Sequence, residues 1–515
     1  MISRQKDNLF VLVKSLSKSE KRQFKLYVGR LGGNTDSKFL ALFNLLDKLK
    51  KYDEASILKS GIVKKAQLSN LKAHLYKQLL ISLRLNPLHQ NIRVQVREQL
   101  DFATILYHKG LYKQSLKILD KAKNMAIENE EKNIAYEIVE LEKVIESQYI
   151  TRSISSRADE LSEQAKYLSI QNTITSKLSN LSLQLYGIML KTGYVRNDQE
   201  YKKITKYFNE RMPKFEMSEL GFREKLWLYK SYLWYSFLVQ DFLSCYKYSN
   251  KWVEMFYKNE SMTALNPVFF LKGNHYLLES LFFIKYHSKF KNALEKLENV
   301  ITKSNLLPKE DNVEVLSFLY VYSNKLNLHF LEGSFEEGLP LVEDILTGIN
   351  KYHDRIDEHH VMVLYYKIAS LYIGAGDCKK CIEYLDKIIS NKSLHMREDL
   401  MCFSRILSLI AHYDIGLDYH LEIQLKSTYK FLLKMNDLHE VQKELIKFLR
   451  SLGDVYPQQL KKEFVKLHST LQKFEEDPYE RRSFLYLDIL SWLESKIENR
   501  PIAEIIQEKF LKLKR

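Results

Sequence analysis

Two cysteines in a Cys-x-x-Cys arrangement, Cys378 and Cys381, are the residues of this chain best suited to metal or redox chemistry. Together with His395 and Cys402 they would complete a four-ligand zinc site. The alternation of strands and helices that surrounds thioredoxin-like redox motifs is missing here. A packing role for the two thiols is therefore favoured. A helix beginning at Cys378 would lower the pKa of a thiol, so weak redox sensing stays open.

The pair His359-His360 is the second candidate for metal chemistry, because it follows Asp354, Asp357 and Glu358. An exposed loop before a helix explains this polar stretch better than a metal site does. The sequence has no glycine-rich phosphate loop, Walker lysine, Gly-x-Ser-x-Gly or His-Glu-x-x-His motif. We therefore expect a protein that is not an enzyme and that needs no metal and no cofactor.

A basic stripe near the N-terminus could contact the phosphates of a nucleic acid. Lys18, Lys21, Arg22 and Lys25 follow one another at spacings that place them on one side of a helix. Clustered lysine and arginine bind nucleic acid by releasing counterions. The alternative is a solvated face that keeps the protein in solution. Nucleic acid is therefore a candidate partner of residues 1–90.

The net charge of the chain lies almost entirely in those first 90 residues. They contain 18 Lys and Arg against 6 Asp and Glu, a net charge of +12, whereas the remainder contains 61 against 58, a net charge of +3. The dipeptide Asn86-Pro87 is typical of a helix boundary. The sequence therefore predicts a basic N-terminal helical region that ends near residue 90.

Within this region Ser17 and Glu20 are spaced as a capping box at a helix start. Three apolar stripes at helical spacing would form its core: Phe24, Tyr27, Val28 and Leu31; Phe39, Leu42, Phe43, Leu46 and Leu49; Leu68, Leu71, Leu75 and Leu79. A DNA-binding helix-turn-helix over Asp53 to Tyr76 is a weaker alternative. Ser56 and Ser60 fall where that motif needs apolar residues.

Composition indicates an all-α protein. Its 16 glycines and 8 prolines in 515 residues are well below average usage of about 12%, too few for the turns of an all-β fold. Four cysteines do not form a disulfide scaffold. Apolar runs are too short for a signal sequence or a membrane span, so we expect a cytoplasmic protein without membrane contact.

A pattern of small residues around a glycine-then-aromatic turn recurs along the chain. The same offsets of 0, 3, 7, 9, 12, 16 and 19 fit two copies: Ala103, Leu106, Gly110, Tyr112, Ser115, Leu119 and Ala122; then Ala369, Tyr372, Gly376, Cys378, Cys381, Leu385 and Ile388. Weaker copies centre on Phe242, on Phe290, and on Gly333 with Phe335. The glycine can take the left-handed conformation that ends a helix. The small residues would let two antiparallel helices approach closely.

These copies resemble the tetratricopeptide-repeat-like helical-repeat superfamily, with a long period of about 45 residues. The resemblance implies an α-solenoid of stacked antiparallel helix pairs. We expect a basic region at 1–90, repeats at 91–450 and capping helices at 451–515. Hairpin turns are predicted near residues 110, 155, 198, 241, 289, 334 and 377.

An aromatic run that could stack bases fits the same architecture: Trp227, Tyr229, Tyr232, Trp234, Tyr235 and Phe237. Its rings point all round a helix, which favours a buried inner helix. The resemblance implies an interaction scaffold that binds a protein or peptide partner. The alternatives are a nucleic-acid- or ribosome-associated protein and a peptide-responsive regulator.

Overall fold

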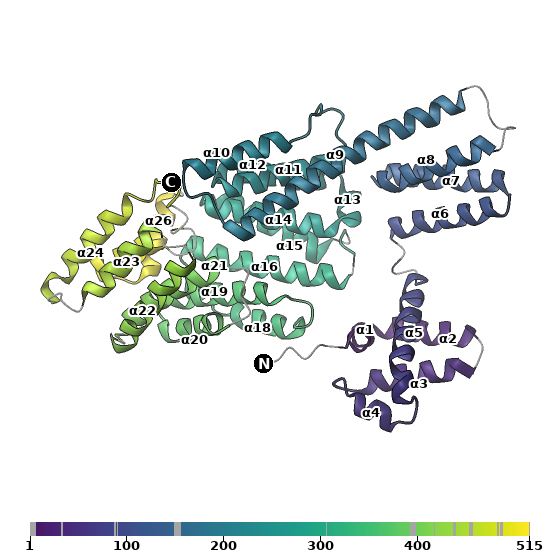
Figure 1. Ribbon diagram of the computed structural model, residues 1–515. Helices are drawn as coiled ribbons and strands as arrows, with labels where there is room; N and C mark the ends of the chain where they lie inside the picture. The colour runs from purple at the N-terminus through teal and green to yellow at the C-terminus, as the bar shows by residue number, and fades with distance from the viewer. Residues whose placement is uncertain are drawn as a thin grey trace. The chain divides into compact units, whose positions relative to one another are not determined.

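The computed structural model of the chain describes residues 7–31, 34–86, 89, 91–148, 156–304, 306–308, 310–391, 398–416, 418–435, 439–452, 457–480, 484 and 488–513. These residues form helices joined by turns, and none of them lies in a β-strand (Figure 1). Helices that follow one another in the sequence pack against each other. The protein is therefore an all-α, solenoid-like protein. Within the described ranges no helix combines the length and the apolar character that crossing a membrane requires.

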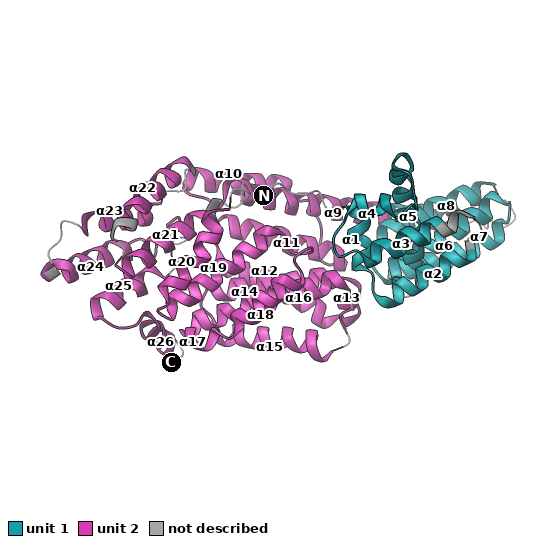
Figure 2. Ribbon diagram, turned by 90° about the horizontal axis from the view of Figure 1, so that it is seen from below, with its two compact units in different colours: residues 1–166 teal, residues 167–515 magenta. Residues whose placement is uncertain are grey.

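The chain divides into two compact units, residues 1–166 and residues 167–515 (Figure 2). The division falls inside helix α9 (Arg157–Thr192). Unit 1 thus contains the basic N-terminal region together with the first three helices that follow it. The expected domain boundaries at residues 90 and 450 stay predictions.

Unit 1 contains eight helices before α9. They are α1 (Asn8–Ser15), α2 (Lys18–Leu31), α3 (Asn34–Lys48), α4 (Glu54–Lys59), α5 (Lys65–Arg84), α6 (Ile92–His108), α7 (Tyr112–Glu128) and α8 (Lys132–Gln148). Helices α1 to α5 share one core, in which Phe24, Phe43 and Leu75 are almost fully buried. The capping box is confirmed: the Ser17 N–H donates to Glu20 at 2.6 Å, and the Glu20 N–H donates to Ser17 Oγ at 3.3 Å.

Unit 2 continues the helical hairpins from α9 to the C-terminal helices. Its further helices are α10 (Asp198–Arg211), α11 (Phe222–Leu238), α12 (Phe242–Lys258), α13 (Glu260–Leu265), α14 (Pro267–Phe283), α15 (His287–Lys303), α16 (Asp311–Glu332), α17 (Phe335–Gly338), α18 (Leu341–Lys351), α19 (Glu358–Gly374), α20 (Cys378–Ile389), α21 (Glu398–Asp414), α22 (Asp418–Met435), α23 (Glu440–Ser451), α24 (Pro457–Gln472), α25 (Ile489–Glu498) and α26 (Ile502–Leu513). Helices α14, α16, α19 and α21 pack in succession. They form the inner row of the hairpins.

Most of the predicted hairpin turns are confirmed. Turns near residues 110, 198, 241, 334 and 377 separate α6 from α7, α9 from α10, α11 from α12, α16 from α17 and α19 from α20. The turn predicted near residue 155 lies outside the described residues. The turn predicted near residue 289 is displaced, because α14 ends at Phe283 and α15 begins at His287.

One turn geometry recurs between paired helices. A residue with positive φ stands two positions before the second helix: Gly110 (73°), Gln240 (59°), Lys285 (54°), Gly333 (70°) and Gly376 (82°). At each turn the next N–H bonds back to a carbonyl five residues earlier, which closes a Schellman motif. Glycine adopts this conformation without strain, and the lysine and the glutamine do not.

This geometry corrects the assignment of Phe290. In the copy built on α14 and α15, Lys285 takes the place of Gly110, so His287 corresponds to Tyr112 and Phe290 to Ser115. The ring of Phe290 is fully buried where α15 packs on α14, not at the start of the helix. The register was three residues wrong because this turn has no glycine to mark it.

The small residues of the first copy do allow two helices to approach. Ala103, Ser115 and Ala122 are fully buried, and Ser115 Oγ donates to the Ala103 carbonyl at 2.7 Å, directly joining α6 to α7. Ala369 is likewise fully buried in α19. Tyr112 is half-buried, with its ring 5.9 Å from that of Tyr107.

Candidate functional site

The basic stripe of α2 is only partly available for binding. Lys18, Arg22 and Lys25 are exposed, whereas Lys21 forms an ion pair with Asp47 at 2.8 Å. That contact joins α2 to α3, so Lys21 has a structural partner that the spacing of the sequence did not show. Three of the four predicted phosphate-contacting residues therefore face solvent.

Helices α4 and α5 are joined by a short turn in which Gly61 has a φ of 70°. Ile57 is fully buried in α4, while Ser56 is half-buried and donates its hydroxyl to the Asp53 carboxylate. Gln67, Asn70 and His74 are exposed, as the helix-turn-helix alternative requires. Lys72, which the same alternative needs at the surface, bonds instead to Asp7 and to the Tyr52 hydroxyl.

The cysteines are packed as thiols. Cys378, Cys381 and Cys402 are buried and unbridged, and His395 lies outside the described residues. Burial raises the pKa of Cys378 to about 11 and raises the pKa of Cys381 as well. The neutral thiol is therefore the stable form of both at neutral pH, which does not favour the redox-sensing alternative.

The His359-His360 stretch forms the start of α19. Asp357 caps this helix, accepting from the His360 N–H at 3.0 Å while its second oxygen lies 2.6 Å from the His360 ring. Among the described residues, no group of three or more His, Cys, Asp or Glu side chains is arranged to hold a metal ion. Helix capping thus explains Asp357 and His360, and the loop expected for the histidine pair is wrong, because both histidines lie within α19.

A row of aromatic side chains crosses the inner helices of unit 2 and is the first candidate binding site. Tyr186 of α9 lies 4.8 Å from Trp234 of α11, measured between ring centroids, and Trp234 lies 5.4 Å from Tyr276 of α14. His275 of α14 stacks on Tyr320 of α16 at 4.4 Å, with an interplanar angle of 9°. Four successive inner helices therefore each contribute a ring with a polar end.

Amide and charged side chains continue this row toward α19. Lys367 Nζ donates to Asn327, Asn327 donates to Asn324 at 3.3 Å, and the Asn324 amide lies 3.3 Å from His275 Nδ1. Glu279, one turn along α14, lies 3.9 Å from His275 Nε2. We call Tyr186, Trp234, His275, Tyr276, Tyr320, Asn324, Asn327 and Lys367 the inner-helix stripe.

Burial shifts the pKa values of two side chains in the inner-helix stripe. Desolvation, together with the Lys367 charge, lowers the pKa of His275 to about 3, so this ring is neutral at physiological pH. Desolvation also lowers the pKa of Lys367 to about 8. Perturbed groups of this kind gather at functional sites, although structural networks produce them too.

Several polar atoms of the stripe lack partners within the described part of the chain. The Trp234 Nε1–H is buried and forms no hydrogen bond there. The hydroxyls of Tyr186, Tyr276 and Tyr320 form none either. A buried donor without a partner is uncommon in folded proteins, so Trp234 Nε1 calls for an explanation, whereas the hydroxyls of Tyr276 and Tyr320 are not fully enclosed.

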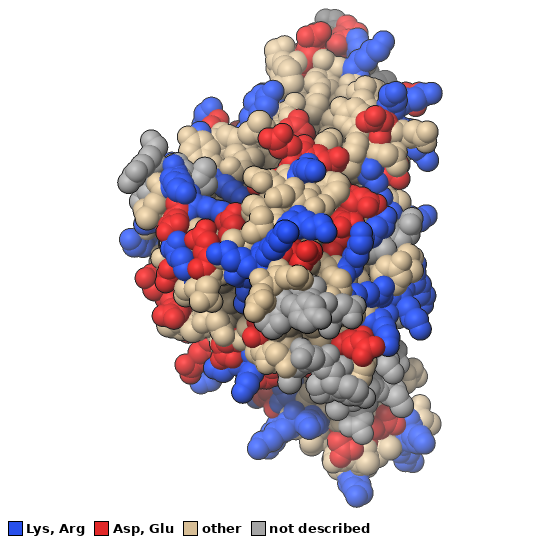
Figure 3. Space-filling view, turned by 90° about the vertical axis from the view of Figure 1, so that its left-hand side faces the viewer, with Lys and Arg blue, Asp and Glu red and all other residues tan. Residues whose placement is uncertain are grey.

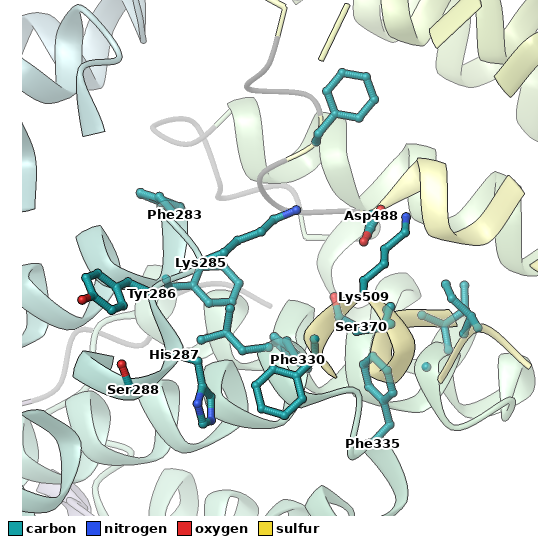
Figure 4. Close-up of a pocket in the computed structure, with 18 residues that line it drawn as sticks. Phe283, Lys285, Tyr286, His287, Ser288, Phe330, Phe335, Ser370, Asp488 and Lys509 are labelled. Atoms are coloured by element: carbon teal, nitrogen blue, oxygen red, sulfur yellow. The ribbon is translucent and has the colours of Figure 1, made fainter. Parts of the chain in front are cut away.

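A cavity of about 350 Å³ in the same unit is the second candidate site (Figure 4). It lies among the α14–α15 turn, the end of α16, α17, α19 and the C-terminal helices α25 and α26. Six phenylalanines line it: Phe282, Phe283, Phe330, Phe335, Phe484 and Phe510. Polar residues stand among them, including Lys285, His287, Ser288, Ser370, Asp488 and Lys509.

Sequence reasoning missed both candidate sites. For the cavity a signal existed, because once the turns are aligned on Gly333 and Gly376, Lys285 is one of the residues that stand where the pattern has glycine. For the stripe the signal was weaker, since His275 and Lys367 are isolated polar residues within long apolar helices. Scans against protein-family models, curated proteins and solved structures each found no match.

Proposed function

We propose that this chain is a non-enzymatic scaffold that binds a protein or peptide segment along the inner-helix stripe. The observation that carries the proposal is the row of unpartnered polar atoms on aromatic rings. Trp and Tyr supply much of the binding energy at protein interfaces because they combine a large apolar area with a polar tip. A bound segment would supply the missing partners of Trp234, Tyr276 and Tyr320.

The rest of the stripe supports the aromatic rings that a partner would contact. Asn324 and Asn327 stand one helical turn apart and are buried, and their amides bond to Tyr320, to each other and to Lys367, so they hold the stripe together from below. Lys367 contributes a positive charge beside them. A segment lying across the stripe would therefore contact the aromatic rings and their polar ends rather than these amides.

A photo-crosslinking experiment tests this proposal. The crosslinker p-benzoylphenylalanine replaces Tyr186, which is 38% exposed at the stripe, or Tyr257 on the outer helix α12, which is 39% exposed. We expect a protein adduct from position 186 that nuclease does not remove, and no equivalent adduct from position 257. The variant Trp234→Ala should reduce the amount of adduct formed from position 186. Equal adducts from both positions would contradict the proposal.

Nucleic-acid association is the second candidate, and the net charge of residues 1–90 favours it. Their charge of +12 is presented in part by the exposed residues Lys18, Arg22 and Lys25 of α2. In contrast, the face of the molecule in Figure 3 carries Lys and Arg interspersed with Asp and Glu. A nucleic-acid contact would therefore involve the N-terminal region, and adducts that nuclease destroys would support it.

A further inference from the structure

Lys285 occupies a turn position where several other hairpins of this chain have glycine, among them those at Gly110, Gly333 and Gly376. Its φ of 54° is close to those of Gly110, Gly333 and Gly376. A side chain with a Cβ is strained in this region, and such strain persists where the surroundings or a function require it. A lysine here therefore needs a reason.

The other non-glycine residues at equivalent turns have structural partners. Gln240, with a φ of 59°, donates from Nε2 to the Val195 carbonyl at 3.1 Å. Glu130, at the α7–α8 turn, pairs with Lys132 at 3.2 Å. The ammonium group of Lys285 forms neither an ion pair nor a hydrogen bond with any described residue.

In Figure 4 the side chain of Lys285 extends from the α14–α15 turn across the cavity toward the side that carries Asp488. The rings of Phe330 and Phe335 lie below it in this view.

The other charged groups of the cavity are balanced within the fold. His287 Nε2 lies 2.6 Å from Glu332, and Lys509 Nζ lies 2.8 Å from Glu494. Asp488 caps α25, accepting from the Ser491 N–H at 2.9 Å and from its hydroxyl at 2.6 Å. Lys285, which is exposed at the rim, therefore has a charge without an ion-pair partner among the described residues of the lining.

The size of the cavity suits a small molecule. A water molecule occupies about 30 Å³ in the liquid, so a space of about 350 Å³ holds about a dozen non-hydrogen atoms. Cavities of this size that combine an apolar lining with a few polar groups are typical ligand sites. The apolar lining favours a ligand with an apolar body, and the positive charge of Lys285 favours an anionic group at one end of that ligand.

We infer that the cavity binds a small amphiphilic carboxylate, with its hydrocarbon body among the phenylalanines and its carboxylate at Lys285. Decanoate has about the required size and serves as the probe. Decanol and decyltrimethylammonium have the same chain with a neutral and a positive end. This inference does not rest on the inner-helix stripe, because none of the residues of the stripe lines the cavity.

Isothermal titration of the full chain tests the inference at ligand concentrations below micelle formation. We expect one saturable site for decanoate, weaker binding of decanol and no binding of decyltrimethylammonium. Lys285→Gln should weaken decanoate about tenfold, the usual contribution of a charge-assisted hydrogen bond. Lys296→Gln removes an exposed charge elsewhere on α15 and should change the affinity less than twofold.

Two further variants separate loss of the ligand from loss of the fold. Lys285→Gly relieves the strained turn, so it should melt no lower than the parent while losing its preference for decanoate over decanol. Ser370→Leu fills the cavity and should abolish binding of both. Equal binding of decanoate and decanol, unchanged binding by Lys285→Gln or Ser370→Leu, or no saturable binding would each overturn the inference.

Discussion

Replacing Gly374 by alanine tests the packing of the hairpin turns most directly. A Cβ built at this residue would lie 2.2 Å from Cδ1, 2.4 Å from Cε1 and 2.4 Å from Cγ of Phe335. Carbon atoms in contact normally stand about 3.5–4.0 Å apart, so the overlap exceeds about 1 Å. Phe335 is only 5% exposed and cannot turn into solvent to relieve it.

Two opposing terms set the size of the effect. Alanine improves the helix by up to about 1 kcal/mol, while overpacking a closely packed contact costs about 1–3 kcal/mol. The large overlap favours the upper end of that range. We therefore expect Gly374→Ala to lower the free energy of unfolding of unit 2 by about 1–2 kcal/mol.

The control is Gly187→Ala in α9, where an added Cβ would meet nothing within 4 Å. Only the helix-forming term acts there, so this variant should gain up to about 1 kcal/mol. The two substitutions are chemically identical and both lie in unit 2. Their opposite signs isolate the contact with Phe335.

Urea unfolding followed by tryptophan fluorescence measures both variants. The four tryptophans, Trp227, Trp234, Trp252 and Trp492, all lie in unit 2, so the signal reports this unit alone. In a Phe335→Leu background, Gly374→Ala should destabilise much less, because the smaller side chain leaves room for the added methyl group. A Gly374→Ala variant as stable as Gly187→Ala would refute the packing of Phe335 over α19.

Three further predictions concern other parts of the chain. Ala103→Leu and Ala369→Leu should each lower the free energy of unfolding by about 1–3 kcal/mol, because the larger side chain overpacks a helix crossing. A variant that unfolds like the parent would show that its residue does not lie at such a crossing. His275 has a folded pKa of about 3 against 6.5 for the free group, so near pH 5 it takes up its proton only on unfolding. The free energy of unfolding of unit 2 should therefore fall by up to about 1.4 kcal/mol per pH unit below about pH 6. The fall should be shallower in His275→Asn, and the same fall in parent and variant would count against the burial of His275. If α2 contacts phosphates, replacing Lys18, Arg22 and Lys25 by Glu should abolish RNA or DNA association. For the parent, the logarithm of the binding constant should fall with the logarithm of the salt concentration at a slope of about −3, from about −0.9 for each of three contacts. A binding constant that does not change with salt would exclude the contact.

The last of these designs leaves Lys21 unchanged for a structural reason. A glutamate at this position would face Asp47, the present partner of the lysine, and would weaken the junction of α2 with α3. The helix pattern alone placed Lys21 in the same class as Lys18, Arg22 and Lys25. Its partner comes from another helix, and the spacing of residues within one helix carries no information about such a contact.

The sequence by itself determined the elements and most of the turns. The informative signals were local properties of the chain, so they can be recognised in the sequence without knowledge of the fold. They were the helical spacing of apolar residues, the scarcity of glycine and proline, and the capping box at Ser17. Gly110 and Gly376 marked their turns because glycine alone adopts the left-handed conformation without strain. Where Lys285 took that conformation instead, the register was lost by three residues and Phe290 was misplaced.

Only the tertiary structure decided where binding groups gather. Tyr186, Trp234, Tyr320 and Lys367 lie up to 181 residues apart in the sequence and come near one another because α9, α11, α14, α16 and α19 follow one another along the row of contacts. The cavity arises in the same way, since α25 and α26 return to the turn after α14. The local sequence pattern determines which face of a helix is apolar. The stacking of the helices determines which polar side chains are removed from water and which of them are left without a hydrogen-bond partner.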